Sequence, residues 1–536
     1  MGRPGPALSG SQPPADVAGR PGKDDGETGA PPRRRGAGSG LLLLLLAYAL
    51  LVSAFVMTNP PGAASDEPSH FYKAAGLALG QVRGEPGVAA DLHPPRSWTP
   101  SMTAWIEKTT RTFVLPADIR GCDAFRLPAP TCARPNLATT TDRQASYVGT
   151  YLPAAYLPPA AGIRVAESVG LGPVGTVRAA RAGGAFVDLA LLGVAGRLLL
   201  VGWRLRLSVL GLVLTVTPLV VFTMSQVSTS GQEITASICL VSGLLRLTSG
   251  QVGRHRRLVW AAVAVAGLLF VTSRPTSPPW CAFVVGLVVL SRPRAAWAAF
   301  RTDVRAALAA ALVVALGSAS TVAWELAFEP SPQVTARQFW RGLPMAVDRL
   351  PAVADQTIGR LGWISIPLGR PTVYLWWGML LALLLTALWL GGWWERAALA
   401  LGAAGVVALT LLVDAGTQQP ASPDFVMQAR YVLSAAVVLP LLAADVVRRR
   451  LPRPGPAQLE PYLCAGAIGL LLFQLARALV ANDTFHRARL ARTPFVKPPL
   501  GWSFWELVAV VAVGLGLLGA AMLRRRPLPP RPRGPA

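Results

Sequence analysis

The sequence has few of the residues on which soluble enzymes build metal and cofactor sites. It contains four histidines in 536 residues, and only 15% of its residues are charged. It has no Walker-type glycine loop, no HExxH pair and no GxSxG motif. These absences argue against a histidine-rich metal site and against the common nucleotide-binding, metalloprotease and serine-hydrolase chemistries. Any chemistry must therefore come from carboxylates, arginines and tyrosines.

Lysine is also scarce, whereas arginine is abundant. Four of the 51 basic residues are lysines, and the formal net charge is +24. The arginines gather in short runs between apolar stretches, as the positive-inside rule describes for cytoplasmic loops, so we expect no nucleic-acid partner. Hydrophobic residues make up 52% of the chain and form repeated runs of near-spanning length. Since about 20 apolar residues cross a bilayer, the chain is predicted to be an integral membrane protein.

The few cysteines divide into two groups. Three of the five fall in apolar runs, whereas Cys122 and Cys132 lie together in a long polar loop. This pair predicts a disulfide if the loop faces an oxidising compartment. Two unpaired thiols are the alternative.

The N-terminal part predicts a tail, an anchor and a long loop. Residues 1–40 are rich in Gly and Pro and lack an apolar period, which predicts a disordered cytoplasmic tail. We interpret 41–58 as an uncleaved signal anchor; a cleaved signal peptide is the alternative, because GAAS at 62–65 is similar to a cleavage site. Either way, 59–180 is an extracytoplasmic loop with short helices lying on the membrane. Its proline-broken segment 146–165 favours an interfacial or re-entrant segment over a full span.

Eleven further apolar runs predict an all-α polytopic membrane protein of about twelve transmembrane helices. The runs are 182–203, 207–225, 234–249, 258–273, 279–291, 305–326, 372–392, 397–414, 432–447, 461–481 and 504–523. An even count returns the C-terminus to the cytoplasm, where the basic tail 524–536 belongs. The transmembrane domain then covers 41–523, with a second large extracytoplasmic loop at 327–371.

Two features disturb this topology. The predicted outer loop 482–503 is basic, so either it is functional or the count of spans is wrong there. The run 279–291 is short, and merging it with 258–273 would invert everything that follows.

The densest cluster of ionisable residues lies in NPPGAASDEPSHFYKAAGLALG, residues 59–80, directly after the first apolar run. Pro68 is typical of the first turn of a helix, so Ser65, Asp66 or Glu67 has a plain structural role as the cap of that helix. His70 follows them by four and three residues, close to one helical face. Carboxylates at a membrane boundary can also bind Mg²⁺ or Mn²⁺, or take a proton from an acceptor hydroxyl. A catalytic role for Asp66, Glu67 and His70 therefore stays open beside the capping role.

Other ionisable residues lie at the predicted outer ends of spans. They are Asp188, Glu233, Arg274, Glu325, Asp414, Arg430 and Arg477. For Arg274 and Glu325 we expect side chains that snorkel to the interface. Arg477 follows Gln474 by three on one helical face, which suits a lipid phosphate, with an intramembrane ion pair as the alternative.

The motif FVMQARYVLSAAVVLP, residues 425–440, places Gln428, Arg430 and Tyr431 at the outer mouth of a span. Arg430 can hold a phosphate there or simply anchor the helix end. Together with Arg477, these three residues form the predicted phosphate-binding set.

The motifs taken together resemble one family. They are DEPSHFYKAAGLALG after the first span, TIGRLGWISIPLGRPTVYL (357–375), QARYVLSAAVVLP, and the cysteine pair and Tyr/Pro stretch of the first loop. They are similar to those of the polytopic bacterial membrane proteins of domain-of-unknown-function family 2142, over roughly residues 41–480. That family is grouped with the GT-C glycosyltransferases, whose long first outer loop carries an acidic motif and whose donors are polyprenyl-phosphate-linked sugars. The resemblance implies that Asp66 is a catalytic base or metal contact, with Glu67 and His70 beside it.

The chain departs from the family pattern at two places. Where the family tends to have an acidic Asn/Asp pattern after the third span, this chain has SQVSTSGQE (225–233), with Glu233 as its acidic residue. Where the family tends to have Gly before Arg-Tyr, this chain has Ala429.

The leading hypothesis is a multi-pass plasma-membrane glycosyltransferase with both termini in the cytoplasm. It would move a sugar from a polyprenyl-phosphate donor to an envelope glycan or protein, with the phosphate near Arg430 or Arg477 and Asp66 deprotonating the acceptor. The first rival is a transporter or flippase of a lipid-linked envelope precursor, which predicts broken helices and repeated halves. The second rival is a non-catalytic envelope-assembly scaffold.

Overall fold

The computed structural model describes most of the apolar part of the chain. The described residues are 35–87, 109–116, 143–200, 204–252, 255–328, 336–417, 427–451, 459–490 and 497–523. The chain divides into two units, Met1–Arg35 and Gly36–Ala536, and the architecture below is that of the second. The predicted disulfide partners Cys122 and Cys132 lie outside the described residues, as do most of the predicted tail 1–40 and the tail 524–536.

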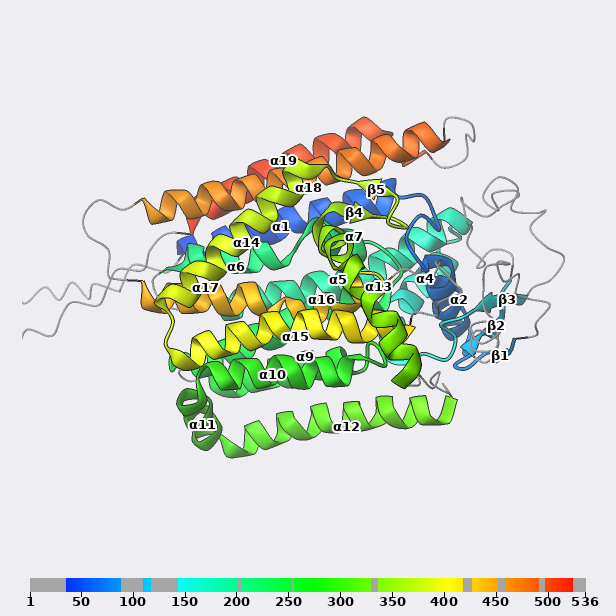
Figure 1. The fold of residues 1–536 in the computed structure, drawn as a ribbon. Coiled ribbons are helices and arrows are strands. Elements are labelled where there is room, and N and C mark those ends of the chain that lie inside the picture. Colours follow the sequence, from blue (N-terminus) through cyan, green and yellow to red (C-terminus); the bar gives the residue numbers. More distant parts are fainter. Residues whose placement is uncertain are drawn as a thin grey trace, which may run out of the picture. The chain divides into compact units, whose positions relative to one another are not determined.

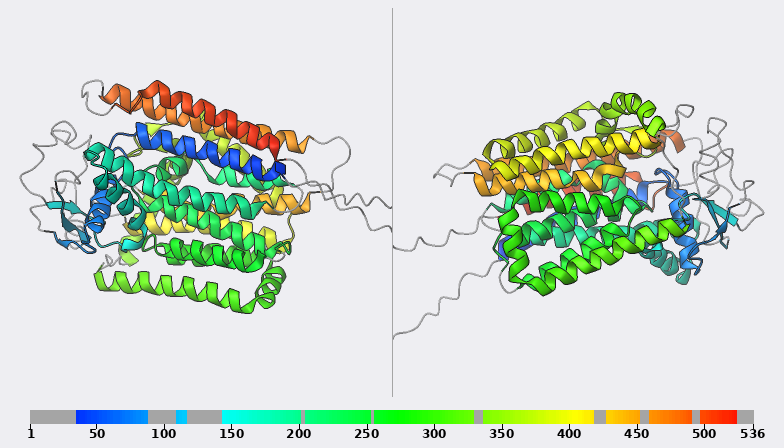
Figure 2. Two further views of the ribbon diagram at one scale, coloured as in Figure 1. Left: turned by 180° about the vertical axis from the view of Figure 1, so that it is seen from behind. Right: turned by 60° about the horizontal axis from the view of Figure 1, so that its bottom comes forward.

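Each predicted apolar run is helical, and the long helices run alongside one another (Figure 1). These helices are α1 (Arg35–Thr58), α5 (Pro173–Leu199), α6 (Leu205–Thr215), α7 (Pro218–Met224), α8 (Thr229–Thr248), α9 (Arg256–Val271), α10 (Ser277–Ser291), α12 (Val304–Phe328), α14 (Arg370–Leu390), α15 (Trp393–Thr417), α16 (Arg430–Ala436), α17 (Val438–Arg450), α18 (Glu460–Leu490) and α19 (Trp502–Met522). Figure 2 shows α12 on one flank of this bundle and α18 with α19 on the opposite flank. The prediction of a helical polytopic membrane protein is confirmed.

The number of spans is smaller by length and composition than the sequence predicted. Within the described residues, eight helices are long and apolar enough to cross a membrane, or up to ten if each of two bent pairs counts as one span. One bent pair is α6 with α7, which meet at 70° just before Pro218; the other is α10 with α11 (Pro293–Thr302), which meet at 103°. The helices α9 and α10 stay separate, so the merger of 258–273 with 279–291 does not occur.

The loops contain short strands that the all-α prediction omitted. The first loop, here residues 59–172, carries α2 (Glu67–Ala78), the 3₁₀ helix η3 (Pro153–Tyr156), α4 (Leu157–Ser168) and an antiparallel sheet of β1 (Glu85–Pro86), β2 (Arg111–Val114) and β3 (Arg143–Ser146). The later loop carries α13 (Ala336–Gly359) and a hairpin of β4 (Arg360–Leu361) and β5 (Ile366–Pro367). These strands have two to four residues, too few for an alternating pattern to appear in the sequence. The segment 146–165 is divided between β3, η3 and α4, and none of these is long enough to span.

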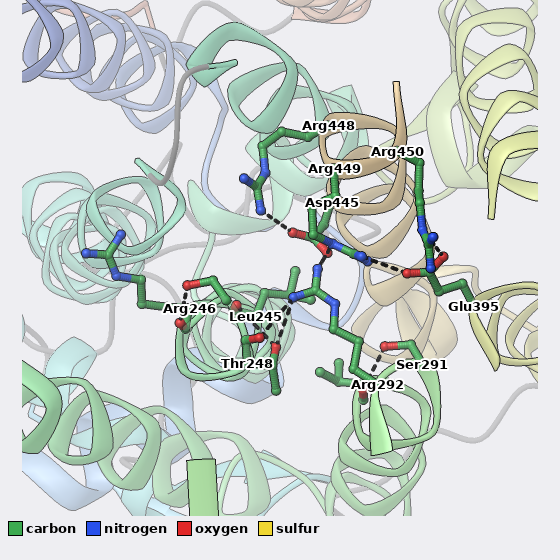
Figure 3. Close-up of polar contacts among 12 residues, drawn as sticks. Leu245, Arg246, Thr248, Ser291, Arg292, Glu395, Asp445, Arg448, Arg449 and Arg450 are labelled. Carbon is green, nitrogen blue, oxygen red and sulfur yellow. Dashed lines mark hydrogen bonds and ion pairs between the residues drawn. The ribbon is translucent and has the colours of Figure 1, made fainter. Parts of the chain in front are cut away.

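One end of the bundle carries a dense network of arginines. The span Arg430–Arg450 has Arg430 at its first residue and three consecutive arginines at its last turn. At this arginine-rich end of the bundle, two acids and four arginines form a network of ion pairs (Figure 3). It consists of Asp445 and Glu395, paired with Arg292, Arg448, Arg449 and Arg450. The motif with Asp66 lies at the other end of the same span, because Asp66 pairs with Arg430.

The first loop is held on the bundle by a close crossing of α4 and α5. A Cβ atom on Gly183 of α5 would overlap the carbonyl oxygen of Pro158, and one on Gly162 of α4 would overlap the carbonyl oxygen of Ala179. Only glycine allows the two backbones to approach so closely. The neighbouring Gly184 is different, because its nearest neighbour would be a side-chain atom of Pro159 at 3.7 Å, an ordinary contact.

Gly183→Ala is expected to destabilise the protein and Gly184→Ala is not. Overpacking at Gly183 should cost about 1–3 kcal/mol, whereas both substitutions gain the same helix propensity. The measurement is the unfolding temperature of the purified variants in one detergent. Equal unfolding temperatures for the two variants would contradict the α4–α5 crossing described here.

Candidate functional site in the first loop

The start of α2 differs from the capping arrangement that the sequence suggested. Asp66 is the residue before the helix, and Pro68 lies in the first turn as predicted. Asp66 has a φ of 64°, in the left-handed region, and its side chain makes no capping hydrogen bond. The capping hypothesis for Asp66 is therefore wrong. The left-handed backbone, which aspartate tolerates better than most residues, turns the carboxylate away from the helix.

The Asp66 carboxylate binds two side chains from distant parts of the chain. Oδ2 forms an ion pair with the Arg430 guanidinium, and Oδ1 accepts a hydrogen bond from the Tyr147 hydroxyl. Arg430 also donates from Nη1 to the carbonyl oxygen of Ser65 at 2.9 Å. The side chain of Arg430 is 7% exposed and that of Asp66 is 16% exposed. The structure thus brings together the two motifs that the sequence analysis selected separately.

This environment keeps Asp66 ionised. Burial alone would raise the pKa of Asp66, but the charge of Arg430 and the hydrogen bond from Tyr147 outweigh it and lower the pKa below its ordinary value. The same contact has the reverse effect on its partner, because burial and the negative charge of Asp66 raise the pKa of Tyr147 well above 10. At neutral pH the pair is a carboxylate and a phenol.

Glu67 has a different surrounding from Asp66, although the two are adjacent. Its side chain is 1% exposed and forms a two-point ion pair with Arg181 of α5, at 2.7 Å to Oε1 and 2.6 Å to Oε2. The backbone N–H groups of Gly62 and Val227 donate to the same carboxylate at 3.1 and 3.2 Å. With these four donors on its two oxygens, Glu67 fixes the loop in place.

The divalent cation predicted between Asp66 and Glu67 stays a prediction, and the contacts do not favour it. Each carboxylate already has its own arginine. Among the residues that the structure describes, no group of three or more His, Cys, Asp and Glu side chains is placed to hold a metal ion.

His70 lies one turn into α2 and is buried. Its Nδ1 is 2.8 Å from the hydroxyl of Tyr156, and the two rings stack with centroids 5.7 Å apart. Burial lowers the pKa of His70 to about 3, against the opposing effect of Asp66, and the charges of Arg430 and Arg274 lower it further. His70 is therefore neutral at physiological pH and positions the Tyr156 side chain.

The predicted phosphate-binding residues separate into two places. Arg430 and Gln428 line one cavity, and the guanidinium of Arg430 lies 5.4 Å from the ring centre of Tyr431. Arg274 lies over the same ring at 4.8 Å and is 7% exposed, so the expectation that it snorkels to the interface is wrong. Arg477 is exposed on α18, where it donates to Gln474 at 3.3 Å, and it is not among the described residues that line the cavity.

The cavity beside Arg430 is small and is lined by both polar and apolar residues. Its volume is about 30 Å³, which is room for one or two water molecules. Two of its lining residues, Arg430 and Gln226, have a buried polar atom with no hydrogen-bond partner in the described part of the chain, Nε and Oε1 respectively. Buried polar atoms normally have partners, so an unpaired donor and an unpaired acceptor in one cavity indicate a place for a polar ligand or water.

The β4–β5 hairpin covers this cavity. The Ser65 hydroxyl donates to the carbonyl oxygen of Gly362 at 2.8 Å, and the Trp363 indole donates to the carbonyl oxygen of Gly62 at 3.3 Å. Gly362 also lines the cavity. Two hydrogen bonds thus join the hairpin, which belongs to the motif at 357–375, to the residues just before Asp66.

The other acidic candidates lie within the bundle. Asp188 accepts from Thr235 at 2.9 Å, Glu233 accepts from Ser277 at 2.7 Å, and Asp414 is 3.8 Å from Arg349. Asp188, Glu233 and Asp414 are buried, whereas Glu325 is half-buried. None of these four lines the cavity in the described structure.

Sequence reasoning missed the partners of the acidic motif. Arg181 lay just outside the predicted span 182–203, and Tyr147 and Tyr156 were interpreted only as headgroup-layer aromatics. A weak signal existed for Arg181, since an arginine next to an apolar run needs either water or a counter-charge. The tyrosines gave no signal for a specific contact.

A comparison of the chain with models of protein families finds a matching family. A family model described as "Predicted membrane protein (DUF2142)" matches residues 49–439. This range includes Asp66, Glu67, His70 and Arg430 but not Arg477. A search of curated proteins finds no match.

Arg181→Met is expected to destabilise the protein strongly, because it leaves Glu67 buried without a counter-charge. Breaking a buried pair in this way costs about 3–5 kcal/mol. The control is Arg178→Met, one turn earlier on α5, where the half-buried arginine makes a single 3.3 Å hydrogen bond to Met57. The amounts of folded, monodisperse protein and the unfolding temperatures should separate the two variants; similar losses would contradict the role assigned to Arg181.

The contribution of His70 to the stability of the protein is expected to fall as the pH is lowered from about 6.5 towards 3. Protonation favours the unfolded chain in this window, because the pKa of His70 is about 3 in the fold and ordinarily 6.5. Asp66 adds to the loss only below its own ordinary pKa of 3.8. His70→Gln should flatten the pH dependence of the unfolding temperature between pH 6.5 and 4. Substitution of the exposed His255 by Gln is the control and should leave the slope unchanged.

Proposed function

The chain belongs to the family of predicted membrane proteins described as DUF2142, and we propose that it is a membrane glycosyltransferase with Asp66 as its catalytic base. Its donor would be a sugar linked to a polyprenyl phosphate, and its acceptor a hydroxyl of an envelope glycan or protein. The observation that carries the proposal is the ion pair between Asp66 and Arg430, an arginine that lines a cavity with unpaired polar atoms. This pair places a proton acceptor next to a group that binds phosphate.

The chemistry requires both members of the pair. The acceptor oxygen forms a bond to the anomeric carbon of the donor sugar while the bond from that carbon to the phosphate oxygen breaks. The polyprenyl phosphate leaves with the electron pair, and the acceptor proton passes to the Asp66 carboxylate. Arg430 would stabilise the leaving phosphate, for which its unpaired Nε is available in the described structure. Because the pKa of Asp66 is lowered by Arg430, movement of that arginine towards the phosphate would make Asp66 a stronger base.

The site is closed in the described structure, so substrate entry needs movement. A cavity of about 30 Å³ cannot hold a sugar, whereas ligand pockets commonly measure about 300–1,000 Å³. The β4–β5 hairpin is the element whose displacement would open it, since two hydrogen bonds hold it to residues 62–65. The donor lipid would then lie between helices with its phosphate at Arg430.

The charge distribution supports a topology in which the Asp66 end faces outward. The opposite end holds the network of Arg292, Arg448, Arg449 and Arg450, and arginine-rich ends face the cytoplasm. We propose that the protein lies in the plasma membrane with both termini in the cytoplasm and the reaction on the outer face. Lipid-linked donors fit that side, where nucleotide sugars are absent.

Asp66→Asn is expected to lower sugar transfer about 100-fold or more, the usual contribution of a general base, while membrane levels stay normal. The assay incubates purified protein in lipid with a panel of radiolabelled polyprenyl-phosphate sugars and membrane acceptors. Glu325→Gln is the control, since this half-buried acid of α12 does not line the cavity in the described structure. An active Asp66→Asn variant would overturn the base assignment. Movement of the labelled lipid across vesicles without transfer would instead support a flippase, and unchanged envelope composition after loss of both Asp66 and Glu67 would support a scaffold.

A further inference from the structure

A second buried polar cluster joins the end of α1 to α18. Asn482 and Asp483 of α18 are both fully buried, as is Asn59, which follows the last residue of α1. The side-chain amide of Asn482 donates to Asn59 Oδ1 at 2.7 Å and to Asp483 Oδ1 at 3.4 Å. The hydroxyl of Thr58 lies beside the Asp483 carboxyl. Residues 482 and 483 begin the basic segment 482–503 that the predicted topology left unexplained.

Three oxygen atoms of this cluster have no hydrogen-bond partner among the residues that the structure describes. They are Thr58 Oγ1, Asn482 Oδ1 and Asp483 Oδ2, and each is shielded from solvent. One unsatisfied buried polar atom costs about 1–3 kcal/mol, and three in one place would be a large fraction of the stability of a protein. Carboxylate, amide and hydroxyl oxygens gathered in one buried place are ligands that a hard cation takes.

The charge of the cluster selects the kind of cation. An ionised Asp483 contributes one negative charge, whereas the nearby Glu506 is neutralised by its ion pair with Arg487. A monovalent cation therefore leaves the buried site neutral. A divalent cation would leave a net positive charge away from water, which is costly. Amide and hydroxyl oxygens beside one carboxylate also suit a weakly held monovalent ion rather than a divalent one.

We propose that Thr58, Asn482 and Asp483 bind a monovalent cation, sodium, between α1 and α18. Water molecules complete its coordination, and one of them accepts from the otherwise unpaired Asn59 Nδ2. The site differs from the divalent-cation site expected at Asp66 and Glu67, and it does not depend on the proposed transferase activity.

The sodium site is connected to the first-loop motif by a short chain of contacts. The carbonyl oxygen of Asn59 accepts from Arg181 Nη1 at 2.7 Å, and Arg181 in turn holds Glu67. Bound sodium would therefore fix the point at which α1 ends and the chain turns towards Asp66. Sodium binding is therefore expected to raise the stability of this region.

The test measures sodium binding to the full-length protein in lipid nanodiscs, with radioactive sodium, and the unfolding temperature in sodium or choline chloride at equal ionic strength. The wild-type protein should bind one sodium ion and unfold several degrees higher in sodium chloride. Asp483→Asn should lower the sodium affinity at least about tenfold, or 1.4 kcal/mol, because it removes the one formal charge among the three ligands.

Four further variants guard against simple misfolding. Thr58→Val keeps the shape of the side chain and should weaken sodium binding, whereas Thr58→Ser should retain it. Asp414→Asn, which alters another buried carboxylate of a span, should keep the sodium response. Asp66→Asn should also keep it, so that failure of the transferase proposal and failure of the sodium proposal give different results.

Three outcomes would overturn the proposal. They are equal sodium binding by the wild-type protein and Asp483→Asn, stabilisation by magnesium but not by sodium, and an absence of any sodium effect together with a more stable Asp483→Asn variant. The last result would mean that the cluster holds water and a protonated carboxyl group.

Discussion

The arrangement of the first loop depends on one arginine whose hydrogen bonds are complete. Arg181 has five N–H donors, and the structure gives each an acceptor: the two oxygens of Glu67 and the carbonyl oxygens of Val56, Asn59 and Pro60. The three backbone acceptors lie at the end of α1 and in the two residues after it, where helix carbonyls lack intrahelical partners. The carbonyl oxygen of Pro60 also accepts from the Ala63 N–H. Arg181 therefore ties α5 to the end of α1 and to the start of α2 at once. It satisfies a helix end and a buried carboxylate with one side chain.

This constraint gives two neighbouring acids different properties. Glu67 is enclosed by Arg181 and two backbone N–H groups, so its carboxylate has a structural role. With Glu67 fixed, the left-handed backbone of Asp66 directs the preceding carboxylate towards Tyr147 and towards Arg430, which lines the cavity. Asp66 keeps a charged partner, but that partner is an arginine with an unpaired donor. Of the two acids, only Asp66 is placed where a substrate could compete for its partner.

The sequence predicted the helices well and the contacts between them poorly. Apolar runs determine where a helix forms in a membrane protein, so the predicted runs coincide with observed helices. The number of spans was less certain, because α8 carries Gln232, Glu233 and Thr235 on buried faces and α6 is bent against α7. Asp66 and Arg430 could each be selected as candidates from their motifs. Their pairing could not, since it joins residues 364 positions apart and no periodicity reports such a contact. Asp66 forms an ion pair and does not cap α2. This difference also depends on a single backbone angle, which the sequence does not specify.

The structure accounts for the alanine at position 429. From the family resemblance we expected a glycine before Arg-Tyr, and a glycine there would suggest an unusual backbone conformation. Ala429 has φ −55° and ψ −29°, which are ordinary helical values that need no glycine. Its N–H donates to Gln356 Oε1 at 3.1 Å, and Gln356 and Ala429 both line the cavity. What this position must supply is therefore a small side chain and a backbone donor, so that α13 can approach Arg430. Alanine meets both requirements, and the substitution leaves the geometry of the Asp66–Arg430 pair intact.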